Sequence, residues 1–132
     1  MVKPFHMIFG GLAAAGLSAC GQTSPTSDVR VATYLGVETR RLDDEIVSFL
    51  VRMEGARDNQ DVADYGKCAA AQYALIRGYG FARHLRTNVQ ERGGLWAADA
   101  VYTISASLPE GLQTIDAEVV VEDCAQKGIP TV

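Results

Sequence analysis

The chain has 132 residues, of which 48% are hydrophobic and 21% are charged, a composition typical of one globular domain. Its formal net charge of −4 argues against nucleic acid as a partner, because binding to phosphates needs a basic surface. The same acidic balance does not indicate a polybasic segment of the kind that holds proteins on membrane surfaces.

The first residues follow the order of a secretory signal peptide. Lys3 precedes an uncharged run from Met7 to Leu17, and small residues follow before Cys20. As a helix this run would rise only about 16 Å, whereas the core of a bilayer is about 30 Å thick. A retained membrane anchor is therefore the weaker interpretation, and we expect residues 1–19 to be removed on export.

The end of this segment, Leu17-Ser18-Ala19-Cys20, resembles the lipobox of bacterial lipoproteins. The resemblance implies cleavage before Cys20, acylation of its thiol and attachment to a membrane through the acyl chains. It also implies a domain that faces the periplasm, and Gly21 in place of Asp after the cysteine points to the outer membrane. The alternative is an ordinary signal peptide with a chance cysteine.

Residues 20–28 contain the cysteine and a polar string, GQTSPTSD, that has no large apolar side chain and is typical of a flexible tether. As a random coil, residues 21–28 would span roughly 16 Å. Residues 29–132 then form a single domain close to the membrane.

The first half of this domain predicts two strands and a helix. Residues 29–42 and 45–55 alternate in hydropathy on either side of Asp43-Asp44, which predicts a hairpin. Asp61 is the predicted N-cap of a helix over 62–77, and Gly78 ends it. The expected inward side chains are Val31, Thr33, Leu35 and Val37 in the first strand, and Val47, Phe49, Val51 and Met53 in the second.

The second half predicts three strands, over 79–89, 95–108 and 115–121, although FARHLR at 81–86 also suits a helix. The expected inward side chains are Tyr79, Phe81, Leu85 and Val89; then Trp96, Ala98, Ala100, Tyr102, Ile104, Ala106 and Leu108; then Ile115, Ala117, Val119 and Val121. The prediction is an α+β fold, an antiparallel sheet in β-β-α-β-β-β order with one helix packed on one face.

Two further cysteines belong to the domain, Cys68 in the predicted helix and Cys124 directly after the last predicted strand. With Cys20 acylated, they are an even pair and predict a disulfide in an oxidising compartment, which would join the helix to the end of the sheet. A redox site is the alternative, but the chain has no C-x-x-C motif, and the acidic neighbours of Cys124 would raise its thiol pKa.

The sequence gives little support for a catalytic site or a metal site. His84 is the single histidine after residue 20, no G-x-S-x-G motif is present, and a zinc site needs more ligands than His84 and two cysteines. We interpret His84 as a surface residue of an outward-facing strand position. We therefore expect a protein without catalytic residues, metal or cofactor.

One charge pattern has two interpretations. Arg77, Arg83, Arg86 and Arg92 form a basic segment, whereas residues 110–123 hold five acids and no base. These charges either pair across neighbouring strands, or leave arginines free to contact anionic lipid, polysaccharide or a protein partner. Trp96 is most simply a core residue, although an exposed tryptophan at that turn would suit an interface.

The leading hypothesis is a non-enzymatic envelope lipoprotein that serves as a protein-interaction or assembly accessory. The alternative is a periplasmic binding module for a small anionic or polysaccharide ligand. In both cases the candidate contact residues are Arg83, His84, Arg86 and Trp96.

Overall fold

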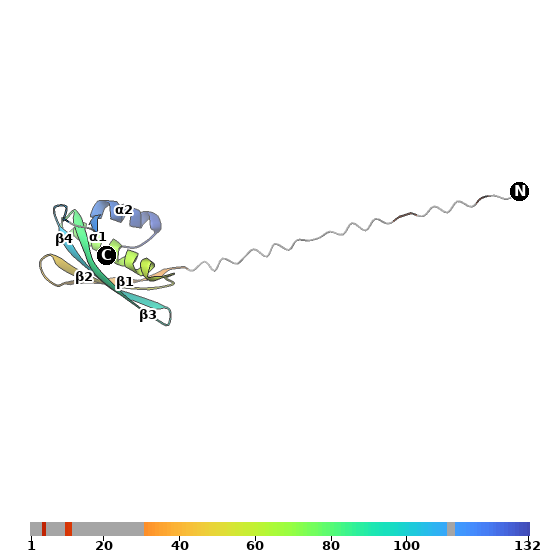
Figure 1. Cartoon of the computed structure of the whole chain (residues 1–132), viewed down its shortest axis with the longest axis horizontal. Coiled ribbons are helices and arrows are strands. Elements are labelled where there is room, and N and C mark those ends of the chain that lie inside the picture. Colours follow the sequence, from red (N-terminus) through yellow and green to blue (C-terminus); the bar gives the residue numbers. More distant parts are fainter. Residues whose placement is uncertain (1–3, 5–9, 12–30, 111–112) are drawn as a thin grey trace.

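The computed structural model describes residues 4, 10, 11, 31–110 and 113–132. Its elements are β1 (Thr33–Arg41), β2 (Ile46–Glu54), α1 (Asn59–Ile76), β3 (Phe81–Arg92), β4 (Leu95–Ser105), β5 (Thr114–Asp116) and α2 (Ala117–Lys127). The strands form one antiparallel sheet in the order β1-β2-β4-β3-β5, and both helices lie on the same side of it (Figure 1). The predicted α+β class and β-β-α-β-β-β order are confirmed, and a second helix follows.

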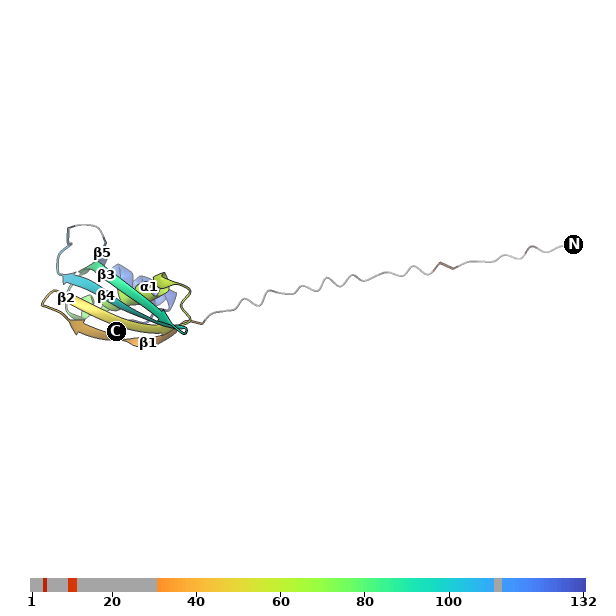
Figure 2. The ribbon, with the colours of Figure 1, turned by 60° about the horizontal axis from the view of Figure 1, so that its bottom comes forward.

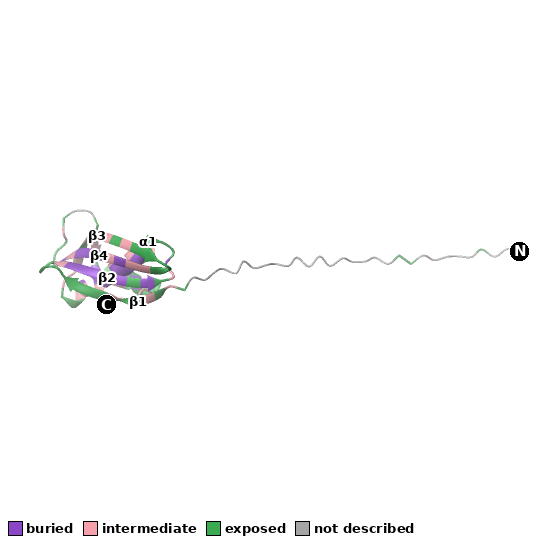
Figure 3. Ribbon diagram, turned by 90° about the horizontal axis from the view of Figure 1, so that it is seen from below, coloured by how far each residue is buried: buried purple, intermediate pink, exposed green. Residues whose placement is uncertain are grey.

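The central strands β2 and β4 supply the floor of the core. Their helix-facing side chains are those predicted from the alternation, except that β4 ends at Ser105 and leaves Ala106 and Leu108 exposed. Figure 3 views the sheet from the side without helices and shows buried residues along β2 and β4, with exposed ones along β1. The buried side chains are Val47, Phe49, Val51, Met53, Ala98, Ala100, Tyr102 and Ile104.

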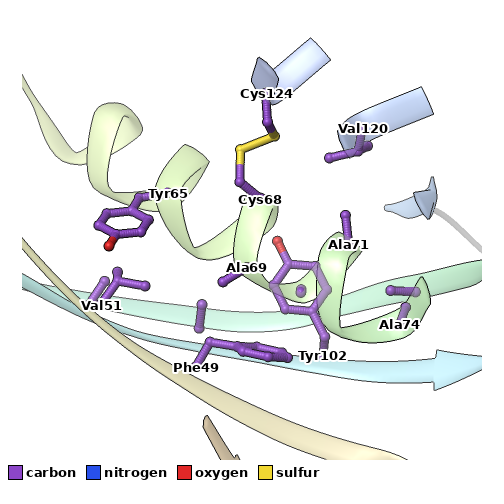
Figure 4. Packing of buried hydrophobic residues seen from close by; sticks show 14 of the residues in the cluster. Phe49, Val51, Tyr65, Cys68, Ala69, Ala71, Ala74, Tyr102, Val120 and Cys124 are labelled. Atoms are coloured by element: carbon purple, nitrogen blue, oxygen red, sulfur yellow. A yellow bond between two sulfur atoms is a disulfide. The ribbon is translucent and has the colours of Figure 1, made fainter. Parts of the chain in front are cut away.

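Helix α1 packs closely on this floor because its contact face is built from small residues. Ala69, Ala70, Ala71 and Ala74 are fully buried, and a Cβ placed on Gly66 would lie only 2.7 Å from the Cβ of Ala100. The larger Tyr65 fills the space over β2, and Phe49 and Tyr102 fill it from the sheet (Figure 4). Small residues on helix and strand therefore set how near α1 approaches the sheet.

The predicted start of α1 is wrong, whereas its predicted end at Gly78 is confirmed. The N-cap is Asp58, whose side chain accepts a hydrogen bond from the N–H of Asp61, so the predicted cap lies three residues too late. The first turn of the helix is polar and faces solvent, so no apolar residues at helical spacing mark its start in the sequence. At the other end, Gly78 adopts a φ of 79° just after the C-cap, as expected of a helix-ending glycine.

Bulges in β1 and β3 overturn the inward positions predicted before each bulge, whereas Val37 and Val89, which follow the bulges, pack against the core as predicted. In β1 the register shifts between Tyr34 and Gly36, so Tyr34 and Val37 face the helices while Leu35 is 49% exposed. In β3 the shift lies between His84 and Arg86, and Leu85 is exposed. Since side chains alternate with a period of two, one extra residue reverses the faces on one side of each bulge.

The segment predicted as a strand over 115–121 is wrong beyond its first residues. Strand β5 ends at Asp116, whose carboxylate caps α2 by accepting hydrogen bonds from the N–H groups of Glu118 and Val119. Val119 is exposed instead of inward, and Val120 is buried. Cys124 therefore lies on a helix, not after a strand.

The disulfide between Cys68 and Cys124 is present, with a sequence separation of 56 residues. It joins α1 to α2 and not a helix to the end of the sheet (Figure 4). Helix α2 packs on α1 and beside β5, with Ala117, Val120 and Cys124 buried. The bridge therefore fastens the second helix onto the first.

The predicted signal peptide, the lipobox at Cys20 and the tether lie outside the described residues, apart from isolated positions. In the part of the chain that the structure describes, no helix is long and apolar enough to cross a membrane.

Candidate functional site

The bulge at Leu85 separates the candidate contact residues onto two faces of the sheet. Arg83 pairs with Thr103 and Arg86 with Val101, and both arginines are exposed on the open face, the face without helices. His84 pairs with Tyr102 and lies on the helix side. The structure therefore brings the two arginines together on the open face, whereas the histidine lies on the opposite face of the sheet, toward the helices.

Asp99 of β4 is the polar centre of the open face. One carboxylate oxygen accepts a hydrogen bond from Ser48 Oγ at 2.5 Å, and the other lies 3.3 Å from Arg86 Nη1. Ser48 is only 5% exposed, so its hydroxyl needs this partner. Sequence reasoning missed both residues, although Asp99 interrupts the apolar sequence of β4.

In the part of the chain that is described, the arginine segment does not pair with the acids of residues 110–123. Arg86 forms its ion pair with Asp99 instead, and Arg40 pairs with Glu38 at 2.8 Å on the same face. The acids Glu118, Glu122 and Asp123 belong to α2, on the other side of the sheet. The helices are thus predominantly acidic, whereas arginines collect on the open face.

A shallow groove of about 310 Å³ crosses the open face between β2, β4 and β3. Arg52, Asn88, Gln90 and Asp99 line it, and Ala97 lies among its lining residues. Neither Arg83 nor Arg86 is among the residues that line it. Three partly exposed leucines are spread over the strands around it, namely Leu35, Leu85 and Leu95.

His84 is half-buried between β3 and α1, so its interpretation as an outward-facing surface residue is wrong. Its Nδ1 lies 2.8 Å from Gln113 Oε1 and its Nε2 lies 2.7 Å from Thr87 Oγ1. The ring also contacts Tyr102 edge to face, with 5.1 Å between centroids. The ring's partners are an amide and a hydroxyl, so no carboxylate orients it as a catalytic base.

A cavity of about 290 Å³ opens beside His84. Helix α1 forms one wall with Gln60, Ala63, Asp64 and Lys67, and β3 forms the other with His84 and Thr87. Gln113 and Ile115 close one end, and Tyr102 lines it from the sheet. Burial raises the pKa of Tyr102 above its ordinary value, so its hydroxyl stays protonated across the physiological range.

A larger hollow of about 470 Å³ lies between the start of β1, the first turns of α1 and the end of α2. Its charged lining residues are largely paired within the protein: Arg57 binds Asp61 at 2.9 Å, and Lys127 binds Asp123 at 2.7 Å. In the described residues, no group of three or more His, Cys, Asp or Glu side chains could hold a metal.

Trp96 lies on the helix side of β4, opposite Met53 of β2. It is half-buried and packs against the edge of the core. The core interpretation of Trp96 is therefore confirmed, and the open face does not include it.

Comparison with known proteins gives a family. A family model described as the YNQ4 C-terminal domain matches residues 34–128, the segment from β1 to α2. The chain belongs to the YNQ4 C-terminal domain family. One protein similar to this chain is named "Uncharacterized 26.9 kDa protein in nqo8 5'region" and comes from Paracoccus denitrificans.

That relative is 30% identical over 92 residues, which are 70% of this chain and 36% of the relative. The chain thus spans little more than a third of the length of this curated relative. No solved structure matches the chain at a significant level.

Proposed function

We propose that this protein is a non-enzymatic component of the bacterial envelope, anchored by acyl chains on Cys20, that binds another protein through the open face of its sheet. The acyl chains place it in a membrane, with the domain facing the periplasm at the outer membrane. The role is that of an interaction or assembly accessory.

The observation that carries this proposal is the character of the open face. Arg83 and Arg86 lie side by side on it, next to the exposed Leu85, and neither α1 nor α2 covers it (Figure 3). Arginine is enriched at protein interfaces, where its planar group forms paired hydrogen bonds while its stem packs on apolar atoms. A basic face on an acidic protein favours a partner with an acidic surface.

The lipid anchor is supported by the lipobox and by the cysteine usage of the domain. Cys68 and Cys124 are paired with each other, which leaves Cys20 as the thiol available for acylation. Disulfides persist in oxidising compartments such as the periplasm. A tether of residues 21–28 would keep the domain within roughly 16 Å of the membrane on average.

The test is a purification of the native protein in mild detergent from the membranes of cells that produce it, followed by mass spectrometry. We expect a protein partner in a fixed ratio, which Arg83→Glu abolishes. Arg77→Glu is the matched control, because it reverses a charge near the end of α1 and away from the open face. Full retention of the partner by Arg83→Glu would overturn the open face as its binding site.

The anchor is tested separately with Cys20→Ala. Wild-type protein should carry acyl chains on its N-terminal residue and sediment with membranes, whereas the variant should carry none. Unmodified Cys20 in the mature wild-type protein would contradict the lipoprotein assignment.

A ligand-binding role is the second candidate, favoured by the groove that Arg52, Asn88 and Gln90 line. Titration with a sulfated dextran oligosaccharide, followed by NMR, tests it. Saturable shifts confined to this groove, and their loss in Arg52→Ala, would favour ligand binding over a protein partner.

A further inference from the structure

Strand β3 has an outer edge that its neighbour covers only at the start. Strand β5 pairs with Phe81, Ala82 and Arg83, whereas β3 continues to Arg92 (Figure 2). Within the described residues, positions 84–92 have β4 on one side and no strand on the other. This stretch is long enough to pair with another strand of ordinary length.

Two backbone hydrogen bonds show which groups of β3 point outward. The N–H of His84 donates to the carbonyl of Gln113 on the outer side, and the N–H of Ile104 in β4 donates to Glu45 on the β2 side. Antiparallel alternation then directs the N–H and C=O groups of Thr87, Val89 and Glu91 away from the sheet. These groups are an unused template for a further strand.

The cavity beside His84 lies next to this edge. Thr87 belongs both to the edge and to the cavity wall. Gln113, just before β5, and Ile115, within β5, line the cavity at the end where β5 begins. A strand that continued the line of β5 would lie beside β3 at the edge of the sheet, next to the mouth of this cavity. One of its side chains would then enter the cavity beside Lys67 and His84.

The charges on the open-face side of β3 indicate which side chains an added strand would carry there. Arg86 and Arg92 stand on the open-face side of this edge, separated by Asn88 and Gln90. The one acid in β3, Glu91, pairs with Trp96 and therefore lies on the helix side. Because Asp99 already pairs with Arg86, the side chains of an added strand that project toward the open face would meet a net positive charge, mainly from Arg92, together with the amides.

We propose that an extended segment of a protein partner adds to the sheet along β3 at residues 84–92, with acidic side chains on the open-face side and a polar side chain in the His84 cavity. The inference rests on the proposed function, because it names how the partner of that function binds. Main-chain hydrogen bonds would supply affinity, and the cavity and arginines would supply specificity.

The test uses a phage-displayed library of random peptides, selected on the full-length protein in detergent. We expect selected peptides to alternate acidic residues with small polar ones. Thr87→Pro removes an outward N–H and the hydroxyl that contacts His84 while it keeps the pairing to β4, so it should reduce binding by at least tenfold, whereas Thr87→Val, which loses the hydroxyl alone, should reduce it less. Thr39→Pro is the matched control, because Thr39 lies in the opposite edge strand β1 at an equivalent outward position.

A second variant tests the charges without altering the backbone. Arg86→Glu combined with Arg92→Glu should select basic peptides instead of acidic ones. The inference is overturned by peptides that bind Thr87→Pro as well as wild type, or by a library that yields no alternating sequence. A native partner that is lost with Arg83→Glu but kept with Thr87→Pro would overturn strand addition alone and leave the proposed function standing.

Discussion

The hydroxyl of Tyr65 on α1 accepts a hydrogen bond from the backbone N–H of Gly36 in β1, with 3.1 Å between the two heavy atoms. Gly36 lies in the bulge that interrupts the pairing of β1 with β2, where an N–H loses its usual strand partner. The ring of Tyr65 also packs edge to face on Tyr34, at 4.8 Å between centroids. One helix side chain thus satisfies the bulge and fixes the edge strand to the core.

We expect Tyr65→Phe to lower the free energy of unfolding by about 1 kcal/mol, because the ring contacts survive while the Gly36 N–H loses its acceptor. Urea unfolding measures the change. Tyr34→Phe keeps this hydrogen bond and is the control. Equal stability of Tyr65→Phe and wild type would show that water replaces the hydroxyl without loss.

We expect Gly66→Ala to destabilise the domain, by about 1–3 kcal/mol, although alanine is the better helix former. The new methyl group would approach the Cβ of Ala100 to 2.7 Å and push α1 off the sheet. Thermal unfolding gives the comparison. The double variant Gly66→Ala with Ala100→Gly should recover part of the loss, and failure to recover would exclude this contact as the cause.

We expect removal of the Cys68–Cys124 disulfide, by Cys68→Ala with Cys124→Ala, to cost about 4 kcal/mol on the chain-entropy estimate. Because the bridge joins the helices, amide exchange should accelerate in α2 more than in β2 or β4. Thiol counting on denatured, unreduced wild type should find neither cysteine free. Reductant should not change the stability of the double variant, and two free thiols in wild type would refute the pairing.

We expect Asp61 to contribute a pH-dependent part of stability. Hydrogen bonds from the Arg57 side chain, opposed in part by burial, hold the pKa of Asp61 below its ordinary value of 3.8. A lowered pKa in the folded state gives stability that is present above 3.8 and is lost as the pH falls through the folded value. The effect is small, since Arg57 is largely exposed.

Asp61→Asn should therefore be less stable than wild type at neutral pH and equal to it at a pH below both values. Unfolding free energies measured at several acidic pH values test this. A difference that stays constant across the whole range would mean that the charge of Asp61 does not contribute through its ionisation.

Sequence reasoning identified the elements whose burial follows one uninterrupted period. Hydropathy alternates without a break from Val47 to Met53 and from Trp96 to Ile104. Every second side chain in these two ranges lines the core as predicted. Helix α1 and the pairing of Cys68 with Cys124 were also predictable, because the helical spacing and the even cysteine count are local or compositional signals. These features determine the α+β class.

The tertiary structure decided the rest. The bulges at Leu35 and Leu85 depend on pairing with a neighbouring strand. The sequence alone therefore does not show that Tyr34 faces inward, or that His84 and Arg86 lie on opposite faces of the sheet. Residues 117–121 alternate like a strand, yet Ala117, Val120 and Cys124 also fit a helical spacing. Packing on α1 and the disulfide favour the helix, and β5 is left short, which exposes the edge of β3 beside the His84 cavity.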